Sequence, residues 1–169
     1  MDEDPPLELV VLVGLQASGK STFYRQRLSD THVHVSKDLF PNARRRQARQ
    51  VRLIDETLAA GRSVAVDNTN PSPLEWEPLI ALGRRHGAKV VGLWFPPDVA
   101  GSLERNAARR VKIRVPEIGI HATLKRLRRP MTRDGFDTVH TVRMDGAGGF
   151  TVTSTDTGEG EHAGPGSRT

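Results

Sequence analysis

The chain has 169 residues and no cysteine, and its 25 lysines and arginines outnumber its 20 acidic residues, which gives a net charge of +5. This length suits one domain and excludes two full catalytic domains, while the lack of cysteine excludes disulfides and thiolate metal sites and suits a reducing compartment. No apolar run approaches the ~20 residues of a membrane span, so we expect a cytoplasmic protein with no membrane partner.

Apolar and amphipathic segments alternate over residues 9–144, after an acidic segment at residues 1–8. This alternation predicts an α/β fold of three layers, in which helices cover both faces of a parallel sheet of about five strands. Residues 145–169 are polar and rich in glycine, so we expect a disordered tail there. The expected strands are residues 9–13, 32–36, 63–67, 89–95 and 138–143.

Amphipathic segments between these strands predict the helices. The clearest start is at Ser72, where a hydroxyl N-cap, a first-turn proline and Glu75 have the pattern of a capping box. Asp98 is the expected cap of a later helix, and a short helix entered at Pro116 should end before Pro130. Two earlier helices are expected at residues 20–28 and 44–60.

Residues 14–21 read GLQASGKS and match the pattern GxxxxGKS between an expected strand and an expected helix. This pattern folds into a loop whose backbone amides face phosphate groups at the N-terminus of a helix. Lys20 would reach the β and γ phosphates of ATP, and the hydroxyl of Ser21 would bind Mg²⁺. The expected nucleotide-binding residues of the loop are Gly14, Ala17, Ser18, Gly19, Lys20, Ser21 and Thr22.

A nucleotide loop alone fits GTPases, ATPase motors and kinases. The guanine-reading pattern NKxD is absent, and the chain is too short for a motor core with its sensor elements. A small phosphotransferase that uses ATP and Mg²⁺ is the remaining interpretation.

Two carboxylates follow the expected second and third strands, at the sheet edge where open α/β sheets bind ligands. Asp38, in HVSKD, is placed to accept the proton of an attacking hydroxyl, and a helix cap is its alternative role. Asp67, at the end of VAVD, has the position of an acid that holds Mg²⁺ directly or through water. Asn68, Thr69 and Asn70 follow it as candidates for acceptor contacts, or as ordinary turn residues.

Basic residues gather in residues 44–52 and in residues 104–133. Like charges at helical spacing repel one another, so the two clusters favour bound phosphate over a merely solvated face. Arg105, Arg109 and Lys112 have the i, i+4 and i+7 spacing of one helix face. We therefore expect the second segment to be a basic helical lid, with Arg105 on the nucleotide and Arg109 on the transferring phosphate.

Five segments resemble, in chain order, the kinase domain of the polynucleotide 5′-hydroxyl kinase family, the kinase half of polynucleotide kinase 3′-phosphatases: GLQASGKST, VSKD, VDNTNP, ERNAARR and RRPMTRDGFDTV. The resemblance implies a P-loop kinase fold. The roles that it implies are binding of ATP and Mg²⁺ by Lys20 and Ser21, general-base catalysis by Asp38, organisation of the metal or acceptor by Asp67, and contact with the transferring phosphate by Arg109.

The sequence departs from that family's pattern in two places. Some members have an acceptor-binding arginine three residues after the base, where this chain has Pro41; Arg44 is the nearest substitute, and Lys37 is a further basic candidate for the acceptor. The DxDGT motif of the phosphatase half is absent, so we expect kinase activity without 3′-phosphatase activity.

The leading hypothesis is an ATP- and Mg²⁺-dependent kinase of the 5′-hydroxyl ends of DNA or RNA. Two alternatives stay open at this stage: a kinase of a small molecule, such as a zeta-toxin-like enzyme or a sugar kinase, and a nucleotide-dependent binding module. The basic clusters favour the polymer, because contacts to phosphate dominate the affinity of proteins for nucleic acid.

Overall fold

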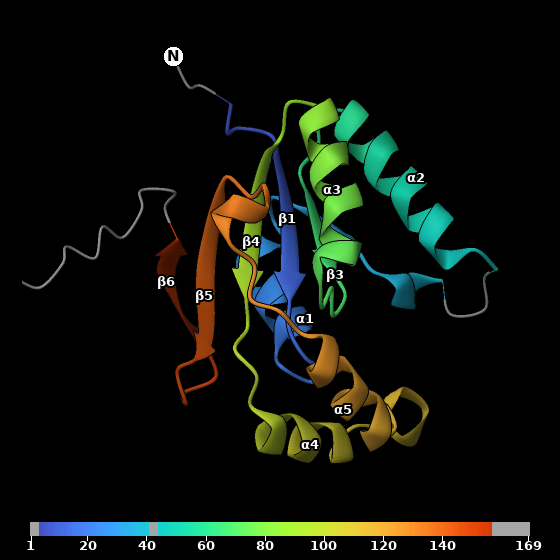
Figure 1. Cartoon of the computed structure of the whole chain (residues 1–169), viewed down its shortest axis with the longest axis vertical. Helices are drawn as coiled ribbons and strands as arrows, with labels where there is room; N and C mark the ends of the chain where they lie inside the picture. Colours follow the sequence, from blue (N-terminus) through green and yellow to red (C-terminus); the bar gives the residue numbers. More distant parts are fainter. Residues whose placement is uncertain (1–3, 41–43, 157–169) are drawn as a thin grey trace, which may run out of the picture.

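The computed structural model describes residues 4–40 and 44–156, which contain a six-stranded sheet (Figure 1). Its strands are β1 Glu8–Val13, β2 Val33–Val35, β3 Val64–Asp67, β4 Lys89–Trp94, β5 Thr138–Met144 and β6 Phe150–Asp156. They lie in the order β2-β3-β1-β4-β5-β6; β1 to β5 are parallel, and β6 pairs antiparallel with β5. The predicted five-stranded parallel sheet is confirmed, with each strand end within one residue of its expected position.

The helices of the described residues are α1 Lys20–Phe23, which continues as the π-helical turn Tyr24–Leu28, α2 Arg46–Ala59, α3 Pro73–Arg85, α4 Val99–Ala107 and α5 Glu117–Arg126. α2 and α3 pack on one face of the sheet, in a core cluster that includes Leu9, Ile54 and Leu79. α1 packs on the other face, where Phe23 joins a cluster with Val10. The predicted three-layer fold is therefore confirmed.

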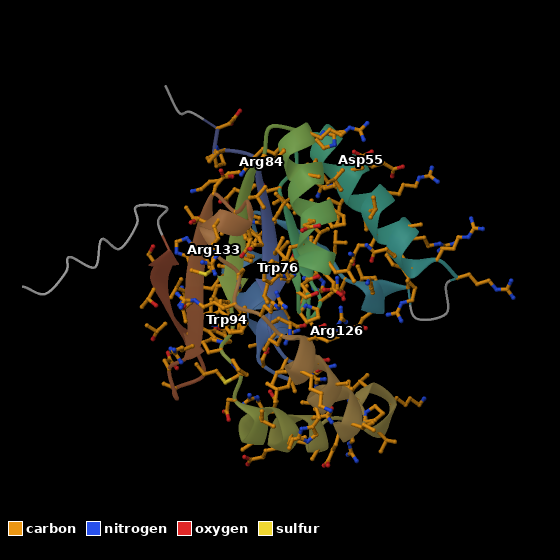
Figure 2. All side chains as sticks on the ribbon, viewed as in Figure 1. Asp55, Trp76, Arg84, Trp94, Arg126 and Arg133 are labelled. Atoms are coloured by element: carbon orange, nitrogen blue, oxygen red, sulfur yellow. The ribbon has the colours of Figure 1, made fainter. Side chains whose placement is uncertain are left out.

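The start of α3 forms the capping box that the sequence predicts. Glu75 Oε2 accepts a hydrogen bond from the backbone amide of Ser72 (3.0 Å), and both halves of the box are present. One residue further, Trp76 lies between α3 and the sheet (Figure 2), is 1% exposed, and meets the Phe136 ring edge-on at 5.6 Å between centroids. This packing fixes the loop that leads from β3 into α3.

α4 and α5 lie beyond the carboxyl ends of the central strands (Figure 1), where the sequence predicts a lid. α4 begins as expected, with Asp98 Oδ1 accepting from the Gly101 amide (3.0 Å). It ends at Ala107, so the prediction that Arg105, Arg109 and Lys112 share one helix face is wrong.

The early end of α4 has a local cause. The side-chain amide of Asn106 donates to the carbonyl oxygen of Val115 (2.6 Å), and its Oδ1 accepts from the Val115 amide (2.9 Å). These two bonds fold the chain back across the end of the helix, so Arg109 lies past α4 and Lys112 lies in the 3₁₀ turn Val111–Ile113.

A β-hairpin occupies part of the segment predicted as a disordered tail, residues 145–169. β6 pairs with β5, so that prediction is wrong as far as residue 156, and the domain extends past its expected end at residue 144; residues 157–169 lie outside the described part of the chain. The polar composition concealed one apolar anchor, because Phe150 is buried against the Phe23 ring, with centroids 5.3 Å apart.

The turn of this hairpin is built by an aspartate and glycines. Asp145 Oδ1 accepts hydrogen bonds from the amides of Ala147 (2.7 Å) and Gly149 (3.0 Å). Gly146 and Gly148 have φ values of 80° and 85°, which residues other than glycine rarely adopt. The aspartate–glycine turn thus places β6 beside β5, and the turn itself lies next to the phosphate loop.

Candidate active site

The predicted phosphate loop joins β1 to α1 and encloses the side chain of Lys20. Lys20 is 7% exposed, and its Nζ donates to the carbonyl oxygens of Gly14 (3.0 Å) and Leu15 (2.5 Å) and to Ser18 Oγ (3.2 Å). Gly19 has a φ of 93°, which lets the chain turn from the loop directly into α1. The loop thus holds the ammonium group at its centre, where the phosphates of a nucleotide would bind.

The pKa of Lys20 depends on the charges of three other predicted site residues: Asp67, Asp38 and Arg109. Burial lowers the pKa of Lys20 to about 8; the charge of Arg109 also lowers it, while Asp67 and Asp38 raise it. The two carboxylates follow β2 and β3 at the same edge of the sheet, and Arg109 of the lid lines the cavity beside the loop.

Ser21 and Asp67 form the pair that the sequence predicts for Mg²⁺. Ser21 Oγ donates to Asp67 Oδ2 (2.7 Å). Burial raises the pKa of Asp67, but hydrogen bonds from His34 and Ser21 and the charge of Lys20 outweigh burial and hold the pKa below its usual value. A hydroxyl beside an ionised carboxylate supplies the oxygen ligands that a small hard cation prefers, so these residues fit Mg²⁺.

His34, which the sequence alone does not single out, completes this group. Its Nε2 lies 2.8 Å from Asp67 Oδ2. The parallel register pairs His34 of β2 with Ala65 of β3, and alternate residues of a strand share a face, so His34 and Asp67 extend from the same face of the sheet. The signal exists only once the strand register is known, because a histidine within VHV carries no motif of its own.

Asn68 and Thr69 connect the end of β3 to the rest of the site. Asn68 Oδ1 accepts from the backbone amide of Lys37 (2.9 Å), and its Nδ2 donates to Gln50 Oε1 (2.7 Å). The carbonyl oxygen of Thr69 accepts from the Gly14 amide (3.0 Å). These bonds fix the turn that carries the candidate base, and the start of the phosphate loop, relative to β3.

Asn70 has a different placement from the one expected for an acceptor contact. It is 4% exposed, and its Nδ2 donates to the backbone oxygens of Leu12 (2.8 Å) and Val66 (3.3 Å). Its own carbonyl oxygen accepts from Trp76 Nε1 (2.6 Å). The buried amide is committed to the backbone of β1 and β3, so we infer a structural role for Asn70.

Asn70→Ala is expected to lower the free energy of unfolding by about 1–3 kcal/mol, because it leaves buried carbonyl oxygens without their donor. Alanine is also less suited than asparagine to the φ of 42° at this position. Urea unfolding measures the effect, with Thr69→Ala as the control that should stay close to wild type. If the Asn70→Ala protein kept its stability but no longer phosphorylated its acceptor, the structural role would be wrong and the predicted acceptor contact would be supported.

Asp38 lies on the 3₁₀ turn Lys37–Leu39 that follows β2, and its side chain is 96% exposed. Its backbone amide donates to Ser36 Oγ (3.2 Å), which fixes the start of the turn. Arg46 Nη2 lies 3.6 Å from Asp38 Oδ1. An exposed carboxylate whose charge reaches Lys20 is accessible to a hydroxyl group arriving from solvent.

The predicted acceptor-side cations lie next to this turn. Arg46 Nε donates to the carbonyl oxygen of Lys37 (3.1 Å), which ties the start of α2 to the turn. Arg44 is exposed two residues earlier in the chain. Pro41, which stands at the position of the family's acceptor-binding arginine, lies outside the described residues.

Two hydrogen bonds join the lid to the phosphate loop. Arg105 Nε of α4 donates to the carbonyl oxygen of Ala17 (2.6 Å), and Gln16 Nε2 donates to Thr123 Oγ1 of α5 (2.9 Å). Each lid helix therefore has its own bond to the loop, which holds the lid over the position expected for a nucleotide.

A cavity of about 340 Å³ opens between the phosphate loop, the lid and the β5–β6 hairpin. The residues that matter for its chemistry are Gly19 and Thr22 beside the loop, Arg105 and Arg109 of the lid, and Met144 and Phe150 of the hairpin. The structure thus brings these four predicted nucleotide or phosphate contacts together with two apolar side chains: Met144, at the end of the expected domain, and Phe150, in the segment expected to be a tail.

Residues 9–132 match a family model described as an AAA domain. The chain belongs to this family. This AAA domain is similar to the bifunctional polynucleotide phosphatase/kinase of Schizosaccharomyces pombe, with 24% identity over 139 residues. That match covers 80% of this chain and 33% of the relative, so the chain spans about a third of the length of that protein.

Solved structures share the fold of this AAA domain. A fungal RNA kinase aligns with a TM-score of 0.61 and 16% identity, over 83% of this chain and 39% of the other. A gluconokinase from Sinorhizobium meliloti 1021 aligns with a TM-score of 0.59 and 18% identity, over 83% of both chains. The predicted P-loop kinase fold is confirmed, and family and fold together support a phosphotransferase that uses a nucleotide.

Within residues 4–40 and 44–156, none of the helices combines the length and apolar composition needed to cross a bilayer.

Proposed function

We propose that this AAA domain is an ATP- and Mg²⁺-dependent kinase that phosphorylates the 5′-hydroxyl ends of DNA or RNA. The observation that carries the proposal is the arrangement at the carboxyl edge of the sheet, where Ser21 Oγ donates to Asp67 Oδ2 (2.7 Å), Asp38 lies on the turn after β2, and Arg109 lines the cavity beside the phosphate loop. A candidate base, a metal-binding carboxylate and a lid arginine thereby surround the position that the γ phosphate of ATP would take.

The proposed donor site places the phosphates of ATP in the loop and its nucleoside in the cavity beside the hairpin. The cavity volume of about 340 Å³ lies at the small end of the range of ligand sites. Met144 and Phe150 give the cavity an apolar side for a flat base, and Arg105 and Arg109 give it a cationic side. When bound, Mg²⁺ would neutralise charge on the phosphate oxygens, held by Ser21 and Asp67.

The proposed reaction is an in-line transfer. The oxygen of the acceptor hydroxyl forms a bond to the γ phosphorus, Asp38 takes the hydroxyl proton, and the bond from the γ phosphorus to the β–γ bridging oxygen breaks to release ADP. Lys20 is proposed to contact β and γ oxygens, and Arg109 the γ oxygens, over which the charge of the transferring group is spread.

A polyanionic acceptor is supported by the charges on both sides of the Asp38 turn. Nucleic-acid binding depends on neutralising phosphates with lysine and arginine, whereas a neutral sugar needs no such surface. Exposed basic residues there include Arg44, Arg45 and Arg49 near the start of α2, and Arg110, Lys112 and Arg114 in the lid.

The comparisons support the same acceptor. The relative's name includes a polynucleotide kinase, and one solved structure of the same fold is an RNA kinase. Because the DxDGT motif of a phosphatase is absent from these residues, we propose that they provide kinase activity without 3′-phosphatase activity.

A kinase of a small hydroxylated molecule is the second candidate. It is favoured by the gluconokinase, because that structure aligns over 83% of both chains and so has nearly the same extent. The phosphate loop, base and lid would serve both reactions, so only the acceptor distinguishes them.

The deciding experiment is transfer of labelled γ phosphate from ATP to a short oligonucleotide with a 5′-hydroxyl, in DNA and RNA forms. Label on the 5′-hydroxyl strand and none on a 5′-phosphorylated copy is the expected result. Gluconate in a parallel reaction tests the second candidate. Label on gluconate alone would replace the polynucleotide by a small acceptor, and release of unlabelled phosphate from a 3′-phosphorylated strand would contradict the absence of phosphatase activity.

A further inference from the structure

We propose that His34 is a positioning residue that holds the Asp67 carboxylate in the orientation needed for Mg²⁺. The inference rests on the proposed function in one respect, because it takes Ser21 and Asp67 as the side chains that bind the metal. It does not depend on the identity of the acceptor.

Both hydrogen bonds to Asp67 end on the same oxygen. Oδ2 lies 2.7 Å from Ser21 Oγ and 2.8 Å from His34 Nε2. We find no protein donor to Oδ1 among residues 4–40 and 44–156. Two donors on one oxygen fix the plane of the carboxylate and direct the other oxygen toward the site, where a metal ion or one of its waters would take it.

The role of His34 becomes larger when a metal is bound. The hydroxyl of a phosphate loop binds the metal, so Ser21 would then leave or share its bond to Asp67. His34 would remain the protein donor that orients a carboxylate buried to 6% exposure. Without His34, Asp67 would be free to rotate at the moment when its orientation matters.

The imidazole ring of His34 is itself held in place. It stacks on the Tyr24 ring with centroids 4.4 Å apart and planes 25° from parallel. The Tyr24 hydroxyl donates to the carbonyl oxygen of His32 on the chain just before β2 (2.6 Å). Tyr24, the first residue of the π-helical turn that continues α1, thus links this turn to the start of β2 and fixes the ring that aims Nε2 at Asp67.

A second histidine–aspartate pair provides a matched control. His86 Nε2 lies 2.6 Å from Asp55 Oδ1, joining the end of α3 to α2. Figure 2 shows Asp55 near the end of the molecule opposite the lid. Loss of this pair should affect stability as loss of the His34 pair does, but it should leave the metal site unchanged.

The experiment measures how Mg²⁺ tightens the binding of fluorescently labelled ADP, in wild type, His34→Leu, His34→Gln and His86→Leu. His34→Leu has no donor and is expected to raise the Mg²⁺ concentration for half-maximal effect by about 10-fold or more, the usual cost of losing such a partner. His34→Gln, similar in size but with an amide donor, should stay near wild type, as should His86→Leu. Binding in EDTA and thermal unfolding verify that each variant is folded.

Each contrary outcome overturns the inference in a recognisable way. Equal Mg²⁺ dependence in His34→Leu and wild type would show that His34 does not position Asp67. Equal impairment of His34→Gln and His34→Leu would assign the effect to ring packing instead of the hydrogen bond. If Mg²⁺ did not change the affinity of the wild-type protein for ADP, both the metal assignment and the inference would be wrong. If the His34 effect were present but no phosphate were transferred to oligonucleotides, only the proposed polynucleotide acceptor would be wrong.

Discussion

Asp38→Asn is expected to lower the rate of phosphoryl transfer to a 5′-hydroxyl by about 10²–10⁴-fold, the contribution of a well-placed general base. The amide has nearly the size of the carboxylate but cannot take the hydroxyl proton. The Asp38 side chain is 96% exposed, and its ion pair with Arg46 is 3.6 Å long, so the fold should tolerate the change. Rates at saturating oligonucleotide give the effect, and calorimetry should find ATP binding largely unchanged.

Asp30→Asn is the matched control for this variant. Asp30 is an exposed aspartate in the turn that precedes β2, at the opposite end of that strand from Asp38. Its replacement should leave the transfer rate at the wild-type value. An unchanged rate in Asp38→Asn would remove Asp38 as the base, and a parallel loss of ATP affinity would mean that Asp38 acts through the charge of Lys20.

The phosphate loop and both carboxylates were predictable because their positions follow from local sequence. A GKS pattern that follows an apolar strand seldom forms anything but a phosphate loop. Lys20 and Ser21 could therefore be assigned to that loop before any tertiary contact was known. Asp38 and Asp67 follow parallel strands, and the carboxyl ends of such strands share one edge of the sheet. The order of elements was therefore enough to bring these groups together.

His34 and Asn70 could not be assigned in the same way, because their roles depend on neighbours distant in sequence. His34 reaches Asp67 through the register of β2 with β3, which no local pattern sets. Asn70 stands in a run of polar residues after a strand, where acceptor contact and support of the backbone look identical in sequence. Its burial beneath the loop and its bonds to the backbone oxygens of Leu12 and Val66 separate the two roles.

The lid and the hairpin explain why the cavity beside the phosphate loop was only half predicted. Helical spacing placed Arg105 and Arg109 on one face, but Asn106 ends α4 between them by bonding the backbone of Val115. The hairpin side was missed because low hydrophobicity over residues 145–169 outweighed the aspartate–glycine turn that pairs β6 with β5. Average composition describes a segment poorly when one buried phenylalanine, Phe150, anchors it.

Arg109→Ala is expected to lower the transfer rate by about 10³-fold or more, the effect of losing an arginine that contacts the transferring phosphate. Arg109 lies just past α4, where its amide donates to the Asn106 carbonyl oxygen (3.1 Å) and its own carbonyl oxygen accepts from Arg114 Nη2 (3.0 Å). This backbone is held by the lid while the side chain lines the cavity beside the loop. The rate of a single turnover should therefore fall far more than the affinity for ADP.

Arg110→Ala separates this role from general lid charge, because Arg110 is the exposed neighbour and carries the same charge. It should weaken oligonucleotide binding slightly and leave the single-turnover rate near wild type. Arg109→Lys should recover only part of the rate, since an ammonium group keeps the charge but lacks the planar fork that contacts two phosphate oxygens at once. Equal rates for Arg109→Ala and Arg110→Ala would mean that both arginines only bind the oligonucleotide. Lys20 would then be the cation that acts on the transferring phosphate.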